Sequence, residues 1–348
     1  MNRGIACALA AAALFGASTP LAKRLVGDID PLILAGLLYL GSGVGLGVLL
    51  CVRRLTTRRP FELALPAGTE WIWLGGAIVA GGIFAPVLLM YGLTMTSAAS
   101  ASLLLNLEAV LTALVAWFVF RENFDRRIAV GMACIVAGGI LLSWSPEVRG
   151  PDRGALLVSA ACAAWAIDNN LTRRVAAADA VVLAGLKGLI AGGTTLAYAL
   201  AVGHELPPLA LVPGVALVGF LGYGVSLVLF VLALRHLGTA RTGAYFSVAP
   251  FFGAALALLL EHDAVNVQLA GAAALMGLGV WLHISERHEH KHAHEAREHA
   301  HSHRHDDHHR HAHAESWDGH EPHAHAHVHE AVVHKHPHYP DMHHRHPH

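Results

Sequence analysis

The feature that most limits how this chain can fold is a series of apolar runs, each about 20 residues long. A helix needs roughly 20 apolar residues to cross the hydrocarbon core of a bilayer. Ten such runs follow one another between short polar segments, at residues 4–22, 31–52, 70–92, 96–119, 128–145, 153–172, 180–202, 211–234, 239–260 and 265–284. The sequence therefore predicts an all-α integral membrane protein with ten transmembrane helices.

Composition supports this class. The chain is 54% hydrophobic and 14% charged, whereas soluble domains carry about 25% charged residues. Residues 286–348 hold 24 of the 28 histidines and 18 of the 49 Asp, Glu, Lys and Arg residues. We interpret this polar segment as a separate, disordered tail. The formal net charge of -1, without a clustered basic surface, excludes nucleic acid as a partner.

The distribution of basic residues predicts the orientation in the membrane, because translocated loops are depleted of Lys and Arg. With the N-terminus inside, four basic residues lie outside, namely Lys23, Arg24, Arg149 and Arg153. Twelve lie inside, namely Arg3, Arg53, Arg54, Arg58, Arg59, Arg121, Arg126, Arg127, Arg173, Arg174, Arg235 and Arg241. We therefore expect a multi-pass protein of the cell (inner) membrane with both termini in the cytosol.

Two internal similarities divide the chain into halves. Residues 15–24 align with 165–174 at an offset of 150, placing Phe15 on Trp165 and one basic pair on another. Residues 93–110 align with 234–251 at an offset of 141, placing Glu108 on Ala249. Each half, 1–147 and 152–285, then contains five helices. Because five is odd, the second copy must be inverted relative to the first, as in many secondary transporters.

These residues resemble a known family. The motifs are Ala17-Ser18-Thr19-Pro20, Asn106-Leu107-Glu108 followed by Arg121-Glu122, and Val248-Ala249-Pro250-Phe251 followed by Glu261. They resemble the EamA family of the drug/metabolite transporter superfamily, in two copies over residues 1–285. The resemblance implies ten helices, cytosolic termini, and export or exchange of small metabolites by alternating access. The sequence departs from the family pattern after the ninth run, where either Glu261 or Asp263 is the acidic exit residue.

Three ionisable residues lie inside predicted spans, where each requires an explanation. Glu108 lies near mid-membrane and is either a proton-coupling carboxylate, a counter-charge for a cationic substrate, or a protonated side chain bound to a neighbouring backbone. Asp168 and Lys187 lie at matching depths on consecutive helices, so they can pair. The pair either fastens the two helices together or belongs to a polar substrate wall.

Further polar and aromatic residues complete the candidate substrate or coupling site. Asn169 and Asn170 follow Asp168 directly, and three adjacent residues span too wide an arc of helix to face one neighbour. The remaining candidates come from the aligned motifs and the predicted spans: Asn106, Thr19, Trp165 and Tyr245. Pro20, Pro86 and Pro250 each release a backbone carbonyl, which serves either a cavity or plain packing.

The tail has the composition of a metal ligand. Its histidines alternate with other residues, and this spacing suits neither a helical site nor a packed core. The candidate ligands are His288, His290, His292, His294, His299, His301, His303, His305, His308, His309, His311, His313, His323, His325, His327 and His329. Imidazole favours divalent Zn, Ni, Co or Cu. The alternatives are a pH-sensitive cationic segment and neutral low-complexity sequence.

These observations leave three functions open. The first is a secondary transporter for a small polar metabolite, with the tail as a metal buffer or regulator. The second is a transition-metal transporter whose tail collects its substrate, and the third is a membrane-anchored metal store or sensor. The sequence holds no GxxxxGK[ST] phosphate loop and no hydrolase motif, so we expect neither an enzyme nor a required cofactor. We expect a monomer or homodimer in the lipid bilayer.

Overall fold

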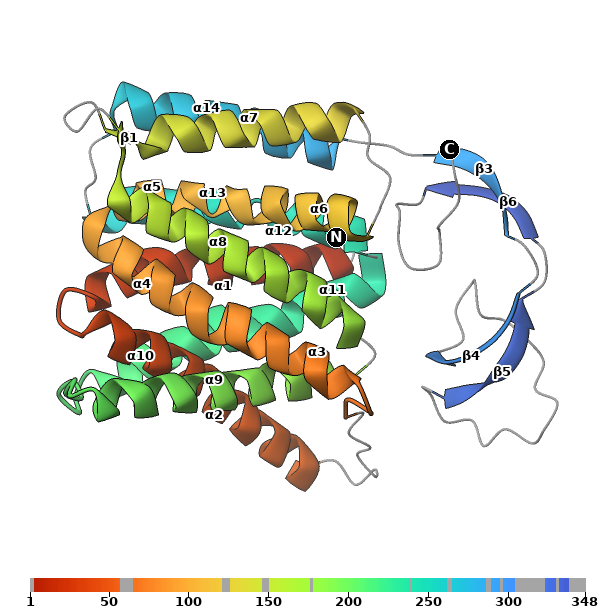
Figure 1. Ribbon diagram of the computed structural model, residues 1–348, viewed down its shortest axis with the longest axis horizontal. Coiled ribbons are helices and arrows are strands. Elements are labelled where there is room, and N and C mark those ends of the chain that lie inside the picture. The colour runs from red at the N-terminus through yellow and green to blue at the C-terminus, as the bar shows by residue number, and fades with distance from the viewer. Residues whose placement is uncertain are drawn as a thin grey trace. The chain divides into compact units, whose positions relative to one another are not determined.

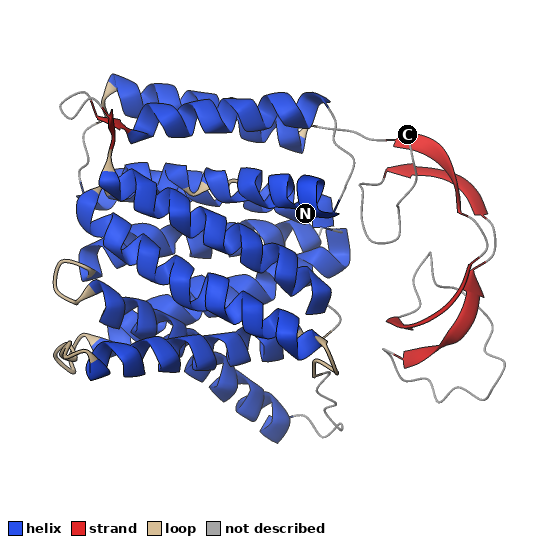
Figure 2. Cartoon of the chain, in the orientation of Figure 1, coloured by secondary structure: helices blue, strands red, loops and turns tan. Residues whose placement is uncertain are grey.

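The computed structural model describes residues 3–56, 65–120, 126–145, 150–175, 178–237, 239–261 and 265–285, and four strands between residues 289 and 337. Contacts divide the chain into two compact units, Met1–Glu286 and Arg287–His348. Helices make up most of the first unit, whereas the described residues of the second are strands (Figure 2).

The first unit contains two series of helices. The first series is α1 (Arg3–Leu25), α2 (Pro31–Thr56), α3 (Glu70–Ala77), η1 (Ile78–Phe84), α4 (Ala85–Met95), α5 (Ala98–Leu104), α6 (Asn106–Phe120) and α7 (Arg126–Ser143). The second is α8 (Arg153–Thr172), η2 (Arg173–Val175), α9 (Ala180–Ala201), α10 (Val212–Gly219), η3 (Phe220–Val225), α11 (Ser226–Leu237), α12 (Thr239–Phe246), α13 (Ala249–Glu261) and α14 (Val267–Ile284). Strands β1 (Trp144–Ser145) and β2 (Gly150–Pro151) pair between them.

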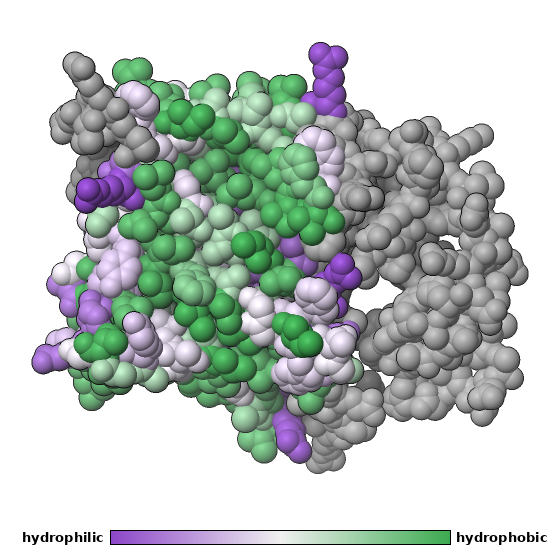
Figure 3. Space-filling view, viewed as in Figure 1, coloured by the Kyte–Doolittle hydropathy of each residue, from purple (hydrophilic) through white to green (hydrophobic). Residues whose placement is uncertain are grey.

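The predicted all-helical membrane fold is confirmed. Within the described residues, seven helices are long and apolar enough to cross a membrane, and Ala249–Leu260 and Val267–Leu282 are shorter apolar helices. The helix α8 belongs to neither group, because three consecutive polar residues lower its hydropathy. Large apolar side chains face outward, among them Leu259 and Phe118, which are 74% and 70% exposed. The visible surface is accordingly hydrophobic along the helices (Figure 3).

Each series contains a π-helix in its third segment. The Ala85 N–H donates to Ala80 O and the Ser226 N–H donates to Leu221 O, both with a separation of five residues. A π-helix inside an α-helix is uncommon and occurs often at functional sites. The fourth segments match as well, because each breaks near its middle, between α5 and α6 and between α12 and α13. The two halves therefore share irregularities as well as helices.

Equivalent helices of the two halves pack against each other across close glycine contacts. In the α7–α14 pair, which lies along one edge of the bundle (Figure 1), a Cβ on Gly138 would lie 2.7 Å from Met276 Cγ. A Cβ on Gly279 would lie 2.7 Å from Ile135 Cγ1. Adding 141 to Gly138 and Ile135 gives Gly279 and Met276, so the two contacts are the same contact made twice.

The ends of α7 and α14 show that equivalent helices run in opposite directions. Near the start of α7, Arg127 Nη2 donates to Ser285 Oγ, beyond the end of α14, at 2.6 Å. Near the start of α14, Gln268 Nε2 donates to Trp144 O, beyond the end of α7, at 2.8 Å. The same holds for α2 and α9, because a Cβ on Gly36 would meet the Leu196 backbone and one on Gly43, further along α2, would overlap the backbone of Leu189, earlier in α9. Five helices per copy thus produce an inverted repeat.

The second unit contains two antiparallel hairpins. Strand β3 (Glu289–His294) pairs with β6 (Val332–Pro337), and β4 (Arg297–His303) pairs with β5 (His323–His329). Two-stranded hairpins are marginally stable in water on their own. Disorder of the tail stays a prediction from the sequence, and the described residues of this unit form these two hairpins. His288, His305, His308, His309, His311 and His313 lie outside the described residues.

Candidate functional site

A charged pair joins α8 to α9. Lys187 Nζ donates to Asp168 Oδ2, and the two side chains are only 14% and 5% exposed. Thr172 Oγ1, one turn along α8, donates to Asp168 Oδ1 at 2.9 Å. Both carboxylate oxygens of Asp168 thus receive a donor. These hydrogen bonds to the carboxylate are needed because an uncompensated charge in a membrane interior is strongly unfavourable.

The π-helix η1 makes room for this pair. A Cβ on Gly81 would overlap the carboxylate of Asp168, so only glycine fits beside it. A Cβ on the next residue, Gly82, would lie 3.6 Å from Lys187 Cγ, which places the lysine stem along the same segment. Two adjacent glycines of η1 therefore face the two partners of the ion pair.

The carbonyl of Gly81 is a second polar centre. The Ala85 N–H, which would bond to it in an α-helix, donates to Ala80 O instead, and Pro86 has no N–H to donate. Two side chains satisfy the released carbonyl: Tyr39 Oη donates at 2.7 Å and Trp165 Nε1 donates at 3.0 Å. The carbonyl released by proline and the π-helix thus connects α2 and α8 to η1.

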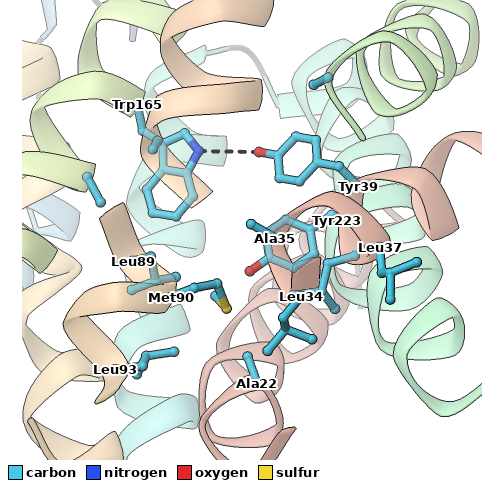
Figure 4. Close-up of a cluster of buried hydrophobic side chains, with 14 of the residues drawn as sticks. Ala22, Leu34, Ala35, Leu37, Tyr39, Leu89, Met90, Leu93, Trp165 and Tyr223 are labelled. Carbon is cyan, nitrogen blue, oxygen red and sulfur yellow. Dashed lines mark hydrogen bonds between the residues drawn. The ribbon is translucent and has the colours of Figure 1, made fainter. Parts of the chain in front are cut away.

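Tyr39 and Trp165, the two donors to this carbonyl, belong to a largely buried group of aromatic rings. Phe15 and Trp165, which the repeat places on one another, meet edge to face with centroids 6.2 Å apart. Phe15 also meets Tyr223 at 6.1 Å, and Tyr223 meets Tyr39 at 5.3 Å. The close-up shows Trp165, Tyr39 and Tyr223 converging from three helices (Figure 4). We refer to Phe15, Tyr39, Trp165 and Tyr223 as the aromatic cluster.

Glu108 pairs with an amide and not with a cation. Asn169 Nδ2 donates to Glu108 Oε1 at 2.8 Å and to Thr112 Oγ1 at 3.3 Å. Asn170 Nδ2 donates to Ala166 O at 2.8 Å and to Thr112 O at 3.3 Å. These bonds tie α8 to α6 beside the ion pair. Glu108, Asn169, Asp168 and Lys187, which we call the polar network, therefore lie on three neighbouring helices.

Two cavities lie elsewhere. One of about 690 Å³ opens between the end of α7 and the start of α14, beside Trp144 and Gln268. One of about 290 Å³ lies between α2, α9 and α11, beside Arg53 and Asp179. Neither is lined by the polar network. Among the described residues, His, Cys, Asp and Glu form no group of three that could hold a metal ion.

Comparison with known proteins identifies the chain. The family model described as "EamA-like transporter family" matches residues 2–144 and 152–285. The chain belongs to this family. It is therefore a multi-pass membrane transporter, in agreement with the sequence resemblance, and not an enzyme.

Other similarities agree with this membership. A protein of Methanothermobacter thermautotrophicus, strain Delta H, named "Uncharacterized transporter", is 25% identical over 288 residues, which cover 79% of this chain and 84% of that protein. A solved structure, titled "Crystal structure of protein", superposes with a TM-score of 0.59 at 19% identity, covering 80% of this chain and 95% of that chain. The latter likeness supports the fold of this EamA transporter.

The inverted repeat creates two equivalent sites in this EamA transporter, and the polar network occupies only one of them. The offsets are 150 for α1 and α8, 149 for α2 and α9, and 141 for the fourth helices. At these offsets, the residues equivalent to the three ionisable residues are neutral: Ser18 corresponds to Asp168, Leu38 to Lys187 and Ala249 to Glu108. The glycine is kept, because Gly222 of η3 is the counterpart of Gly81, and a Cβ there would lie 2.6 Å from Ser18 Cβ. The backbone is duplicated, whereas the charges are not.

The structure brings some of the residues predicted from the sequence together and places others elsewhere. It brings together Glu108, Asp168, Asn169, Asn170, Lys187 and Trp165. Asn106 lies apart: its Nδ2 donates to Leu103 O and approaches Met276 Sδ of α14 at 3.8 Å. Thr19 is buried in α1, and Tyr245 lies on α12, away from these bonds. Their roles in transport stay predictions.

Sequence reasoning missed several partners. Thr112 was signalled by its position one helical turn after Glu108. Gly81 was signalled by Pro86, five residues later, although proline alone does not say which carbonyl is released. Tyr39 had no local signal, because its bond to Gly81 O spans 42 residues.

Proposed function

We propose that this EamA transporter is a secondary transporter that exports or exchanges a small polar metabolite past its polar network. The proposal rests on one observation. The duplicated backbone creates two equivalent sites, and only one of them carries the ionisable residues Glu108, Asp168 and Lys187. A structural requirement would apply to both of the sites that the repeat makes equivalent, and the second of these sites packs with Ser18, Leu38 and Ala249 at the corresponding positions. Ionisable groups present at only one of two equivalent sites point to recognition of cargo or of a coupling ion.

The duplicated backbone supports alternating access. Inverted repeats allow a bundle to adopt two equivalent packings that open toward opposite sides of the membrane. The aromatic cluster is at the boundary between the repeats, because Phe15 of one meets Trp165 of the other. We propose that the termini face the cytosol, so that the end of α8 and the start of α9 form the cytosolic side.

Reconstitution into proteoliposomes tests the proposal. Purified protein is assayed for uptake and exchange of a panel of labelled amino acids, amines and divalent metals. We expect Glu108→Gln and Asp168→Asn to lose most transport of the accepted substrate while the protein stays folded. Glu205→Gln and Asp28→Asn, which make the same chemical changes at exposed positions beyond helix ends, are the matched controls. Normal transport by both network variants would exclude this route.

Metal binding by the tail is a separate proposal. The register pairs histidines across each hairpin, with His299, His301 and His303 opposite His327, His325 and His323, and His290 and His292 opposite His336 and His334. Alternate residues share one face of a strand, and imidazole binds Zn, Ni, Co and Cu. This arrangement supports a metal buffer or regulator in the same chain as the transporter.

Deletion of residues 286–348 separates this role from metal transport. We expect the shortened protein to transport its metabolite normally and to bind less Zn in equilibrium dialysis, because the described helices hold no cluster of three metal-binding side chains. The full chain is the control. If the deletion abolishes Zn uptake into proteoliposomes that the full chain supports, the tail collects a transported metal, and the alternative function is correct.

A further inference from the structure

The ion pair of α8 and α9 is not needed to hold the fold. The equivalent helices of the first copy, α1 and α2, carry Ser18 and Leu38 at these positions. Ser18 Oγ donates to Phe15 O of its own helix at 2.6 Å, so it uses a local acceptor. The place of Gly82 is filled in the second copy by Tyr223, which packs in the aromatic cluster. The same backbone therefore packs without the two charges.

The surroundings of Asp168 fit a primary ammonium group. Thr172 occupies Oδ1, which leaves Oδ2 for a cation. Gly81 contacts the carboxylate, and its carbonyl lies between the rings of Tyr39 and Trp165. A carboxylate and aromatic rings are groups that bind ammonium ions in proteins, whereas the Gly81 carbonyl already accepts two hydrogen bonds. The position is already occupied by a primary ammonium, that of Lys187.

Lysine is also suited to leave this position. Its four-carbon stem is flexible and its ammonium is a compact charge with three donors. The stem lies against Gly82, where a side chain would otherwise confine it. A second cation at Asp168 can therefore replace the lysine ammonium without leaving the carboxylate unpaired.

We propose that Lys187 is a tethered stand-in for the substrate, and that the substrate is a small molecule with a primary ammonium group that displaces Lys187 from Asp168. The proposal rests on the proposed transport function and names its substrate class. In the empty transporter Lys187 neutralises Asp168, so the bundle can reorient without cargo. In the loaded transporter the substrate ammonium does so, and Lys187 turns away along its stem.

The test compares net efflux with exchange in proteoliposomes loaded with labelled putrescine, methylammonium or lysine, and with succinate as an anionic probe. In Lys187→Met, we expect amine exchange to be retained and net efflux to fall about a hundredfold, because an empty transporter with an unpaired buried carboxylate reorients unfavourably. Lys187→Arg should restore part of the net efflux. A merely structural ion pair would instead lower both fluxes together.

A second variant covers the case in which Lys187→Met fails to fold. Asp168→Asn combined with Lys187→Met removes both charges, leaves no unpaired ion, and should fold and lose amine transport. Equal losses of exchange and net efflux in Lys187→Met, or amine transport by the double variant, would overturn the proposal. Transport of succinate but not of amines by the unaltered protein would overturn the substrate class and leave the transport function standing. If the network variants Glu108→Gln and Asp168→Asn leave all transport unchanged, the proposed route itself fails.

Discussion

At the scale of single residues, Gly81 performs two tasks. Its missing side chain admits the carboxylate of Asp168, and its released carbonyl accepts hydrogen bonds from Tyr39 and Trp165. Because both tasks depend on the position of one backbone unit, the ion pair and the aromatic cluster are mechanically connected. A change at Gly81 should therefore disturb both.

We expect Gly81→Ala to lower the thermal stability of the protein and to abolish most transport. The added methyl group overlaps the Asp168 carboxylate, and overpacking of this kind costs about 1–3 kcal/mol. Gly193→Ala is the matched control, because a Cβ there meets no atom within 4 Å. Thermal unfolding in detergent and proteoliposome transport measure the two effects. Wild-type behaviour of Gly81→Ala would show that the close contact with Asp168 is dispensable.

At the scale of helices, the sequence predicted the series of segments and their duplication. Apolar runs show where spans lie, and the two offsets of 150 and 141 reappear as contacts between equivalent helices. The sequence also predicted that Asp168 and Lys187 could pair, because depth in the membrane follows from counting residues along each helix.

Other helix features could not be read from the sequence. The bond between Asn169 and Glu108 depends on the rotation of α8 and α6 about their axes, which is set by packing and not by depth. The π-helix η1 shifts the register by one residue and so decides which carbonyl is released. Asn106 shows the same limit: it lies two residues before Glu108, yet its amide faces α14.

At the scale of the whole molecule, the C-terminal end of α1 is bonded both to a helix of its own copy and to a helix of the other copy. Lys23 Nζ donates to Leu93 O of α4 at 2.5 Å, and Arg24 Nη2 donates to Leu260 O of α13 at 2.5 Å. Basic residues near helix ends bind the unpaired last carbonyls. These two are among the four basic residues that the predicted topology places outside, where Lys and Arg are otherwise depleted.

We expect the combined change of Lys23→Ala and Arg24→Ala to open the bundle at this end. Cys162, which is fully buried in α8, should then react faster with a small maleimide, as measured by mass spectrometry of its peptide. Arg126→Ala, at an exposed position at the start of α7, is the control and should leave the rate unchanged. An unchanged rate in the double variant would mean that these bonds do not close the bundle.

The charges of Asp168 and Lys187, which have no counterpart at the equivalent site, affect the energetics of the transport cycle. When the bundle opens at the ends of α8 and α9, water reaches Asp168 and Lys187 and solvates them, whereas opening at the opposite end leaves both in a dry interior. Hydration favours ions strongly, so the two end states differ in free energy although the inverted repeat makes their backbones nearly equivalent. An empty transporter of this design therefore favours the state in which its charged end is hydrated, and the pairing of Lys187 with Asp168 lowers the cost of passing to the other state.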